Sequence, residues 1–319
     1  MSTMRPDPGT IADAQPTNWV DVYAPSSLKP YFRLARYDRP IGTWLLLLPC
    51  WFGLAFAQVD SAKTDLQLGY YILFAIGAIA MRGAGCTWND IVDRKYDGRV
   101  ERSALRPIPS GQVSVRQAII FGVLQSFVGL LVLLQFNTFT IWLGISSLAL
   151  VVVYPFAKRF TYWPQFVLGM TFNWGVLVGW TSHKGTLIDY GIVAAAPLLL
   201  YVGSIAWTIG YDTIYAHQDK EDDALLGLKS TALRFGPNTR WWLTGFYGAA
   251  IGLWLAASYS VGAGYFTYIA LGLITTQFVW QIASLDIDHS GNCLARFKSN
   301  REVGLLLCIG FLVEAPINW

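Results

Sequence analysis

The chain has 319 residues, of which 54% are hydrophobic and only 13% are charged. Soluble domains typically carry about 25% charged residues, so this chain lacks the charge that a fully hydrated surface requires. Its net charge of +3 argues against a nucleic-acid-binding surface. Its four cysteines are too scattered for a disulfide framework or a zinc site. The composition predicts a polytopic membrane protein.

The polar N-terminal region covers residues 1–25. It lacks the apolar core of a signal peptide and the Arg-rich, acid-poor composition of a transit peptide. We therefore expect a soluble tail over residues 1–25 and one transmembrane domain over 26–319. The lack of a transit signal favours a bacterial inner membrane over a mitochondrial one.

Nine apolar stretches follow this tail, and a helix that crosses a bilayer needs about 20 mostly apolar residues. In chain order they cover residues 41–57, 70–86, 116–134, 138–154, 164–181, 190–209, 241–258, 265–283 and 303–317. Many glycines inside them fit the close helix packing of membrane proteins. The sequence thus predicts an all-α membrane protein, a bundle of nine transmembrane helices.

The basic residues mark one side of the membrane. With nine spans, 21 of the 23 Lys and Arg residues lie in the N-terminal segment, in loops on the same side, or at span ends that face that side. Only Lys63 and Lys184 lie on the other side. Because basic loops stay in the cytoplasm, we expect the N-terminus and every long loop inside and the C-terminus outside.

Two acidic clusters lie in the long inner loops. The first follows the second span, with carboxylates at i, i+3 and i+7, and comprises Asn89, Asp90, Asp93 and Asp97. The second follows the sixth span and comprises Asp212, Asp219, Asp222 and Asp223. Residues seven apart share a helix face. Each cluster is therefore expected to continue its transmembrane helix as a stripe of carboxylates.

Like charges on one helix face repel one another, so these stripes require counter-cations. Mg²⁺ prefers a few carboxylate oxygens together with phosphate oxygens and water, and the two stripes together could hold it against a diphosphate. Basic residues expected to neutralise the phosphates are Arg94, Lys95, Arg102, Arg106, Lys158, Lys220 and Lys229. The simpler interpretation, two solvated turns, leaves the matching seven-residue spacing unexplained.

Other patterns give weaker indications. Residues 227–231 read G-L-K-S-T, like the end of a phosphate-binding loop, but the leading glycine and the preceding strand are missing. The three histidines are too dispersed for a metal site, and His217, inside the second cluster, is expected to face solvent. No G-x-S-x-G elbow of a serine hydrolase occurs.

The two acidic clusters resemble the paired motifs of the UbiA superfamily of intramembrane aromatic prenyltransferases. Both motifs, N-D-x-x-D-x-x-x-D and D-x-x-Y-A-x-x-D-x-x-D-D, are complete, at 89–97 and 212–223. Flanking stretches are similar to those of its 4-hydroxybenzoate branch, namely R-Y-D-R-P-I-G-T-W (36–44), R-P-I-P-S-G (106–111), Y-P-F-A-K-R-F-T (154–161) and G-L-K-S-T-A (227–232). The resemblance covers roughly residues 30–317.

This resemblance implies a nine-helix bundle capped on its cytoplasmic side by the acidic loops. It also implies Mg²⁺-dependent transfer of a polyprenyl group from its diphosphate to the ring carbon ortho to the hydroxyl of 4-hydroxybenzoate, in ubiquinone biosynthesis. All eight cluster residues would hold the metal, and the catalytic ones would be Asp90, Asp93, Asp212 and Asp219. The expected partners are the two substrates and the lipid bilayer.

The acceptor carboxylate requires a cation near the cavity. The acceptor site is expected to include Arg36, Arg82, Arg159, Tyr154 and Tyr215. Arg36 is our first hypothesis for the cation, because it begins the R-Y-D-R-P-I-G stretch. For each arginine, a role as an anchor at the membrane interface competes with this interpretation.

Two alternatives remain open. The chain could be a superfamily member that acts on homogentisate, a naphthoate or haem. It could also be an ion-coupled transporter, but that function calls for carboxylates near the bilayer midplane, where the predicted spans have almost none.

Overall fold

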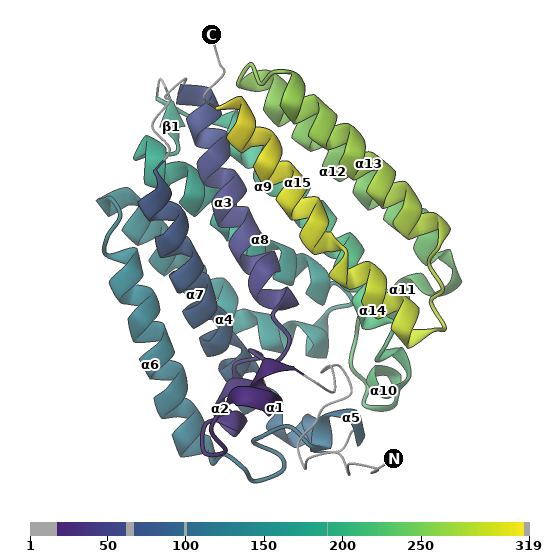
Figure 1. The fold of residues 1–319 in the computed structure, drawn as a ribbon. Helices are drawn as coiled ribbons and strands as arrows, with labels where there is room; N and C mark the ends of the chain where they lie inside the picture. The colour runs from purple at the N-terminus through teal and green to yellow at the C-terminus, as the bar shows by residue number, and fades with distance from the viewer. Residues whose placement is uncertain (1–17, 62–66, 99–100, 190, 316–319) are drawn as a thin grey trace. The chain divides into compact units, whose positions relative to one another are not determined.

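The computed structural model describes residues 18–61, 67–98, 101–189 and 191–315. Within these ranges the chain is mostly helical (Figure 1). The elements are α1 (Trp19–Tyr23), α2 (Lys29–Leu34), α3 (Ile41–Ser61), α4 (Leu68–Asp97), α5 (Glu101–Ala104), α6 (Val115–Leu133), α7 (Thr138–Phe160), α8 (Pro164–Lys184), β1 (Ile188–Asp189), β2 (Ile192–Val193), α9 (Ala195–Ala216), α10 (Lys220–Leu225), α11 (Thr231–Phe235), the 3-10 helix η1 (Gly236–Asn238), α12 (Thr239–Ser260), α13 (Tyr265–Ala283), α14 (Ser290–Lys298) and α15 (Asn300–Glu314). Each predicted span overlaps one of the longer helices.

Five of the described helices are long and apolar enough to cross a membrane, namely α3, α4, α6, α7 and α13. Only 17% of the apolar stretch of α6 and 11% of that of α7 are buried, as expected for helices that face lipid. By contrast, α9 has buried residues on most of its turns and therefore packs mainly against other helices. These helices support a multi-pass membrane protein, while the count of nine spans stays a prediction.

The helices belong to two compact units. Unit 1 combines Met1–Thr43 with Ala75–Val132, and unit 2 combines Trp44–Phe74 with Leu133–Trp319. Helix α4 contributes its first turns to unit 2 and the remainder, including the first acidic cluster, to unit 1. The second acidic cluster belongs to unit 2.

Unit 1 packs the inner end of α4 against the loop that leads into α6. Its buried centre consists of Leu34, Ile108, Val113 and Ala118, with Ile91 of α4 packed against them. Farther along, α4 and α6 approach so closely that a Cβ on Gly129 would collide with the Met81 sulfur. Small residues allow such close approach between membrane helices. The last turns of α4 are thereby fixed within the unit.

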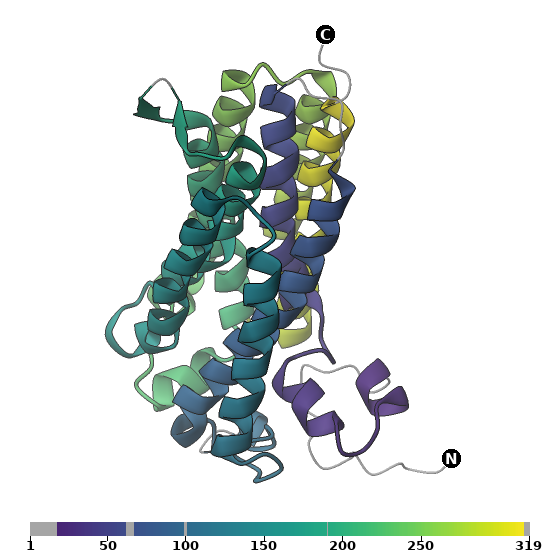
Figure 2. The same cartoon turned by 90° about the vertical axis from the view of Figure 1, so that its left-hand side faces the viewer.

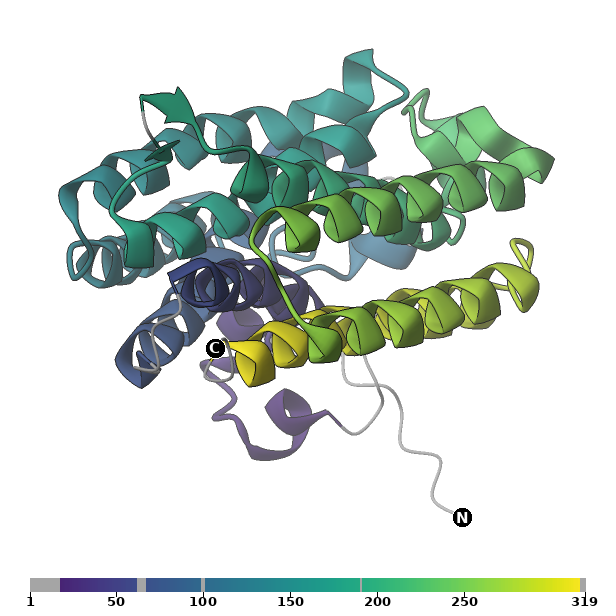
Figure 3. The same cartoon turned by 90° about the horizontal axis from the view of Figure 1, so that it is seen from above.

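Unit 2 is built around α9, which packs against α8 on one side and α12 on another, while α13 lies along α15 (Figures 1 and 3). Its largest buried side chains include Trp207 and Tyr211 of α9 and Trp254 and Tyr247 of α12. The Trp207 and Trp254 rings lie 5.9 Å apart in an edge-to-face arrangement. Aromatic packing of this kind stabilises the contact beyond the burial of area.

Hydrogen bonds tie the same helices together. Asn173 of α8 donates to the Thr208 hydroxyl of α9 over 2.7 Å, and the Trp207 indole donates to the Asn300 side chain over 2.7 Å. Glu314, which is buried, accepts from the backbone amides of Phe266 at 3.0 Å and Thr267 at 3.3 Å. A carboxylate is favourable at a helix N-terminus, so Glu314 caps α13.

The start of the sixth predicted span is corrected by the structure. Residues 190–209 were assigned to one helix, yet β1 and β2 form a short antiparallel hairpin in which Ile188 pairs with Val193. The hairpin links α8 to α9 (Figure 2). Gly191, with φ 81°, supplies the left-handed backbone of the tight turn, and β-branched Ile192 and Val193 favour a strand. The helix therefore begins only at Ala195.

Candidate active site

The first acidic cluster lies on a single helix, as predicted. Asn89, Asp90, Asp93 and Asp97 occupy the last turns of α4. The three carboxylates are almost fully buried, with exposed fractions of 0%, 1% and 8%. Asn89 donates to Asp93 Oδ2 over 3.4 Å. Buried carboxylates require cationic or hydrogen-bonding partners.

Two arginines provide these partners. Arg36 donates to Asp90 Oδ1 over 2.7 Å, and Arg106 lies 3.5 Å from the same oxygen. Arg106 also pairs with Asp97 Oδ2 at 2.7 Å. Arg106 was expected at the diphosphate and Arg36 at the acceptor carboxylate, and the structure brings both to the first acidic cluster.

Arg36 stands in a loop with an unusual backbone. It has φ 62°, the only positive φ of a non-glycine residue in the described part of the chain. Its guanidinium also donates to the carbonyl of Arg33 over 3.2 Å. Beside it, burial raises the pKa of the Asp38 carboxyl, whose nearest cation is Arg39 at 3.4 Å.

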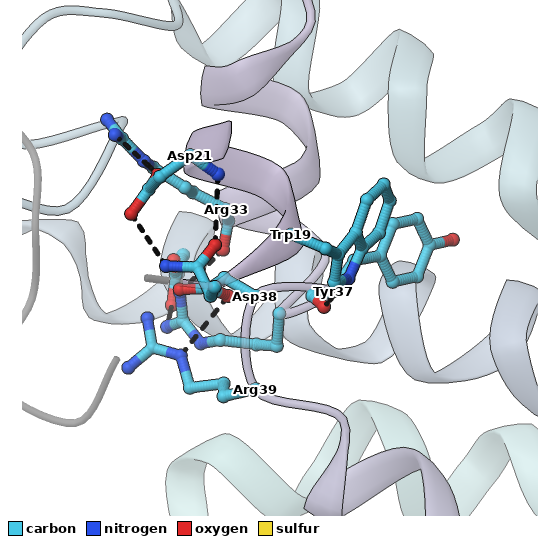
Figure 4. Close-up of polar contacts among 9 residues, drawn as sticks. Trp19, Asp21, Arg33, Tyr37, Asp38 and Arg39 are labelled. Atoms are coloured by element: carbon cyan, nitrogen blue, oxygen red, sulfur yellow. Dashed lines mark hydrogen bonds and ion pairs between the residues drawn. The ribbon is translucent and has the colours of Figure 1, made fainter. Parts of the chain in front are cut away.

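The N-terminal helix α1 braces this loop (Figure 4). The Trp19 indole donates to the carbonyl of Tyr37 over 2.8 Å, and the Asp21 carboxylate pairs with Arg33 at 2.8 Å. Part of the expected soluble tail therefore forms a helix of unit 1, α1 (Trp19–Tyr23), which is capped by Asn18. Residues 1–17 of that tail lie outside the described ranges.

The second acidic cluster does not continue one helix, and that prediction was wrong. Helix α9 ends at Ala216, and α10 begins at Lys220. Asp212 lies in the last turn of α9, Asp219 is the N-cap residue of α10, and Asp222 and Asp223 lie in the first turn of α10. A continuous helix would place these acids at its negative end. The new helix instead places Asp219, Asp222 and Asp223 at its positive end, while Asp212 stays near the negative end of α9.

His217, expected to face solvent, is instead buried at the helix break. Its Nε2 lies 2.9 Å from the Thr239 hydroxyl, which donates to the carbonyl of Gly236. Because that hydroxyl proton is already donated to Gly236, the His217 Nε2 is the donor in this contact. Burial lowers the His217 pKa to about 4, with the nearby Lys220 ammonium acting in the same direction and Asp288 opposing it. Lys220, expected at the diphosphate, pairs with Asp288 at 2.5 Å.

The G-L-K-S-T segment connects helices within unit 2 and does not form a phosphate-binding loop. Ser230 caps α11 by accepting from the Leu233 amide, and the Thr231 hydroxyl lies 2.6 Å from that of Thr213 in α9. Lys229 donates through its backbone amide to Lys158 and through its ammonium to the carbonyl of Phe160. The segment therefore holds the ends of α7 and α9 together.

The other expected site residues are dispersed. Arg94 and Lys95 are exposed, and the side chain of Arg102 lies outside the described ranges. Arg159 lies over the Phe156 ring, and the Tyr215 ring contacts Phe297. Tyr154 is half-buried on α7. Arg82 packs against Gly42, where an added Cβ would collide with the guanidinium.

The carboxylate oxygens themselves show whether a divalent cation fits the first cluster. Across the described residues, no three His, Cys, Asp or Glu side chains gather as a ready metal site. However, Asp90 Oδ2 is buried and has no hydrogen-bond partner in the same part of the chain. Leaving such an oxygen unsatisfied is costly, and carboxylate oxygens are ligands that Mg²⁺ prefers. The first cluster thus fits a hard cation that takes further ligands from elsewhere.

Comparisons with known proteins connect this geometry to a family. A model of the UbiA prenyltransferase family matches residues 46–306, most of the chain and both acidic clusters. The chain belongs to the UbiA prenyltransferase family. The resemblance noted from the two motifs is thereby confirmed.

Relatives of this UbiA protein carry a consistent name. The present chain is 46% identical to the mitochondrial 4-hydroxybenzoate polyprenyltransferase of Arabidopsis thaliana, over 93% of this chain and 71% of that protein. The Drosophila melanogaster and human proteins of the same name are 50% and 47% identical, over 90% and 91% of this chain and 72% and 76% of theirs. The chain spans only 63% of the Aedes aegypti relative.

Solved structures agree on the fold. A UbiA homolog from Aeropyrum pernix, solved without ligand, superposes with a TM-score of 0.68 at 27% identity, over 83% of this chain and 97% of that one. A homolog from Archaeoglobus fulgidus bound to GPP and Mg²⁺ gives a TM-score of 0.61 at 18% identity, over 89% and 99%. The chain therefore has the UbiA fold.

Proposed function

We propose that this UbiA protein transfers a polyprenyl group from polyprenyl diphosphate to the ring carbon ortho to the hydroxyl of 4-hydroxybenzoate, a step of ubiquinone biosynthesis. The names of its relatives, at 46–50% identity for three of them, support the acceptor and the donor class. The observation that carries the proposal is the buried, arginine-flanked Asp90, whose second oxygen is left for a ligand.

The two acidic clusters are proposed to serve the diphosphate. The proposed ligands of Mg²⁺ are the residues of the first cluster, Asn89, Asp90, Asp93 and Asp97, and those of the second, Asp212, Asp219, Asp222 and Asp223. When bound, Mg²⁺ withdraws negative charge from the leaving diphosphate. The A. fulgidus homolog, whose structure holds GPP together with Mg²⁺, supports this proposal.

The remaining charge on the phosphates is assigned to arginines and lysines. Arg106 already stands between Asp90 and Asp97, where it can add a charge-assisted hydrogen bond to a phosphate. Arg94, Lys95, Arg102, Lys158, Lys220 and Lys229 remain candidates. The polyprenyl cation left after departure of the diphosphate is sheltered by apolar and aromatic side chains, which exclude water.

Arg82 is the favoured partner of the acceptor carboxylate. It lies on α4 two turns before Asp90 and packs against Gly42 of the R-Y-D-R-P-I-G-T-W stretch. Placing an arginine within a membrane helix costs free energy, so such a residue is a candidate for a functional role. The further candidates for this site are Arg159, Tyr154, Tyr215 and also Arg36, which is paired with Asp90.

We propose that the protein has nine spans over residues 26–319, with its charged loops on one side of the membrane. In a bacterial inner membrane that side is the cytoplasm, and in a mitochondrial membrane it is the matrix. The relatives named above are mitochondrial, so the expectation of a bacterial membrane receives no support from them.

The test uses purified protein in nanodiscs with a polyprenyl diphosphate and Mg²⁺. We expect prenylated 4-hydroxybenzoate as the product, none after chelation of divalent ions, and no product from homogentisate or a naphthoate. Preferred consumption of either alternative acceptor would replace the proposed acceptor but keep the reaction class. Product formation that survives complete chelation would refute the metal site.

A further inference from the structure

Asp90 already has cationic partners without any ligand. The guanidinium groups of Arg36 and Arg106 lie 2.7 and 3.5 Å from Asp90 Oδ1. The Asp90 carboxylate has no exposed surface. The side chain of Arg36 is itself only 10% exposed. The same carboxylate therefore has one oxygen occupied by cations and one oxygen, Oδ2, left without a donor among the described residues.

This arrangement opposes the binding of a metal ion by itself. A divalent cation at Oδ2 would face the Arg36 guanidinium across a single carboxyl group. Charges of the same sign at such short range repel strongly, more so in a buried setting than in water. Metal binding at Asp90 therefore becomes more favourable when one of the arginines pairs with another anion.

Of the two arginines, Arg36 can separate from Asp90 more easily. Arg106 also holds Asp97 at 2.7 Å, so it has a second carboxylate to keep it in place. Arg36 donates its second hydrogen bond to the carbonyl of Arg33 at 3.2 Å, and it interacts with the buried Asp38 carboxylate through electrostatic attraction. Its left-handed backbone is unfavourable for any residue with a Cβ and persists only when the surroundings enforce it.

We infer that Arg36 is an exchangeable counter-cation of Asp90, which neutralises this carboxylate in the substrate-free protein and transfers its guanidinium to the diphosphate when the metal ion takes Asp90. The inference rests on the proposed function and deepens it. Its consequence is that metal and diphosphate bind cooperatively, because each removes the obstacle to the other.

The experiment measures two affinities of the full-length protein in nanodiscs. Mn²⁺ binding to the substrate-free protein is followed by electron paramagnetic resonance, and binding of inorganic pyrophosphate is measured at saturating Mn²⁺. Replacement of the charged side chain in Arg36→Gln should tighten Mn²⁺ binding by about 10-fold or more. It should weaken pyrophosphate binding by about 10- to 150-fold, the loss of one charge-assisted hydrogen bond.

Opposite shifts of the two affinities distinguish this role from a structural one, which would weaken both. Arg301→Gln is the matched control, because it removes an arginine from an exposed ion pair with Glu302, and it should change neither affinity. Arg36→Lys keeps the charge and should shift both affinities in the same directions but less. If Arg36→Gln does not fold, the lysine variant decides by these directions.

Other outcomes are equally decisive. Unchanged or weaker Mn²⁺ binding in Arg36→Gln, while Asp90→Asn abolishes it, would overturn the inference but keep the proposed metal site. A raised KM for 4-hydroxybenzoate with unchanged pyrophosphate affinity would also overturn it and return Arg36 to the acceptor. Mn²⁺ binding that is insensitive to Asp90→Asn would refute both the inference and the metal site.

Discussion

The two acidic clusters have similar sequences but different structures. In unit 1 the carboxylates stand on one uninterrupted helix, are almost fully buried and include two that are paired with arginines. In unit 2 they are divided between α9 and α10 and are only half-buried. Two of them lie in the first turn of a helix of six residues.

This difference indicates a division of labour. A buried carboxylate with an ion-pair partner is fixed before any ligand binds, and its removal leaves the partner charge uncompensated. A half-exposed carboxylate at the start of a short helix can adjust at little cost, since water already solvates it. The first cluster is therefore fixed in place by its partners, and the second is freer to change its conformation.

The largest effect should be common to both clusters. Asp93→Asn and Asp219→Asn are each expected to lower kcat by at least about 100-fold, because metal-assisted charge stabilisation contributes several kcal/mol. Turnover of 4-hydroxybenzoate at fixed Mg²⁺ measures this. Glu221→Gln removes one exposed charge beside the second cluster and should retain activity. If the variant of Asp93 or of Asp219 is as active as Glu221→Gln, that aspartate does not belong to the site.

Stability should separate the clusters. Asp90→Asn leaves the Arg36 charge without its carboxylate and is expected to lower the free energy of unfolding by about 3 kcal/mol, the lower end for a broken buried pair. Asp222→Asn, in the first turn of α10, should cost less than about 1 kcal/mol. Thermal unfolding in detergent compares the two. Equal losses would contradict the difference in preorganisation.

Acid should affect unit 2 through His217. Its pKa is about 4 in the folded protein, against an ordinary histidine value of 6.5, so the unfolded chain binds the extra proton between these pH values. Stability is therefore complete above about pH 6.5 and falls by about 3 kcal/mol as the pH drops to about 4.

Unfolding of His217→Asn, measured against pH, checks this expectation. Asparagine does not titrate, so the slope between these pH values should decrease. His289→Asn, at an exposed position, should keep the slope of the wild type. An unchanged slope in His217→Asn would show that other groups cause the acid sensitivity.

The smallest effect concerns the brace of the first cluster. Trp19→Phe removes the hydrogen bond to the carbonyl of Tyr37 and should cost about 0.5–1 kcal/mol. Because the Arg36 loop is then less firmly held, Mn²⁺ binding to the substrate-free protein should tighten about twofold. Trp241→Phe removes the same N–H from a side chain that is 79% exposed and should change neither quantity. Weaker Mn²⁺ binding in Trp19→Phe would contradict the brace.

Local patterns predicted the helices and the first cluster well. The limits expected for α13 agree with the structure, residue for residue, and the spacing of Asp90, Asp93 and Asp97 required only the regularity of one helix. The break after α9 could not be predicted in this way. It depends on contacts of His217 with Thr239 and of Lys220 with Asp288, which lie 22 and 68 residues farther along the chain.

Some structure could have been found in the sequence. Asn18 caps α1 by accepting from the Asp21 amide, and an Asn followed three residues later by an acid is a typical helix start. By contrast, no local signal reveals that Arg36 meets Asp90, 54 residues away. That pairing requires the packing of Leu34, Ile108 and Val113, which brings the two segments together.

The cap on α13 has a consequence for biosynthesis. The two amides that Glu314 accepts belong to Phe266 and Thr267, which leave the ribosome 48 and 47 residues earlier. Until Glu314 has been synthesised, α13 lacks this partner at its N-terminus, and Gly264, its N-cap residue, provides no side chain to substitute. The N-terminal cap of α13 is thus supplied only when α15 has been synthesised nearly to its end, and a nascent chain that stops short of Glu314 lacks this cap.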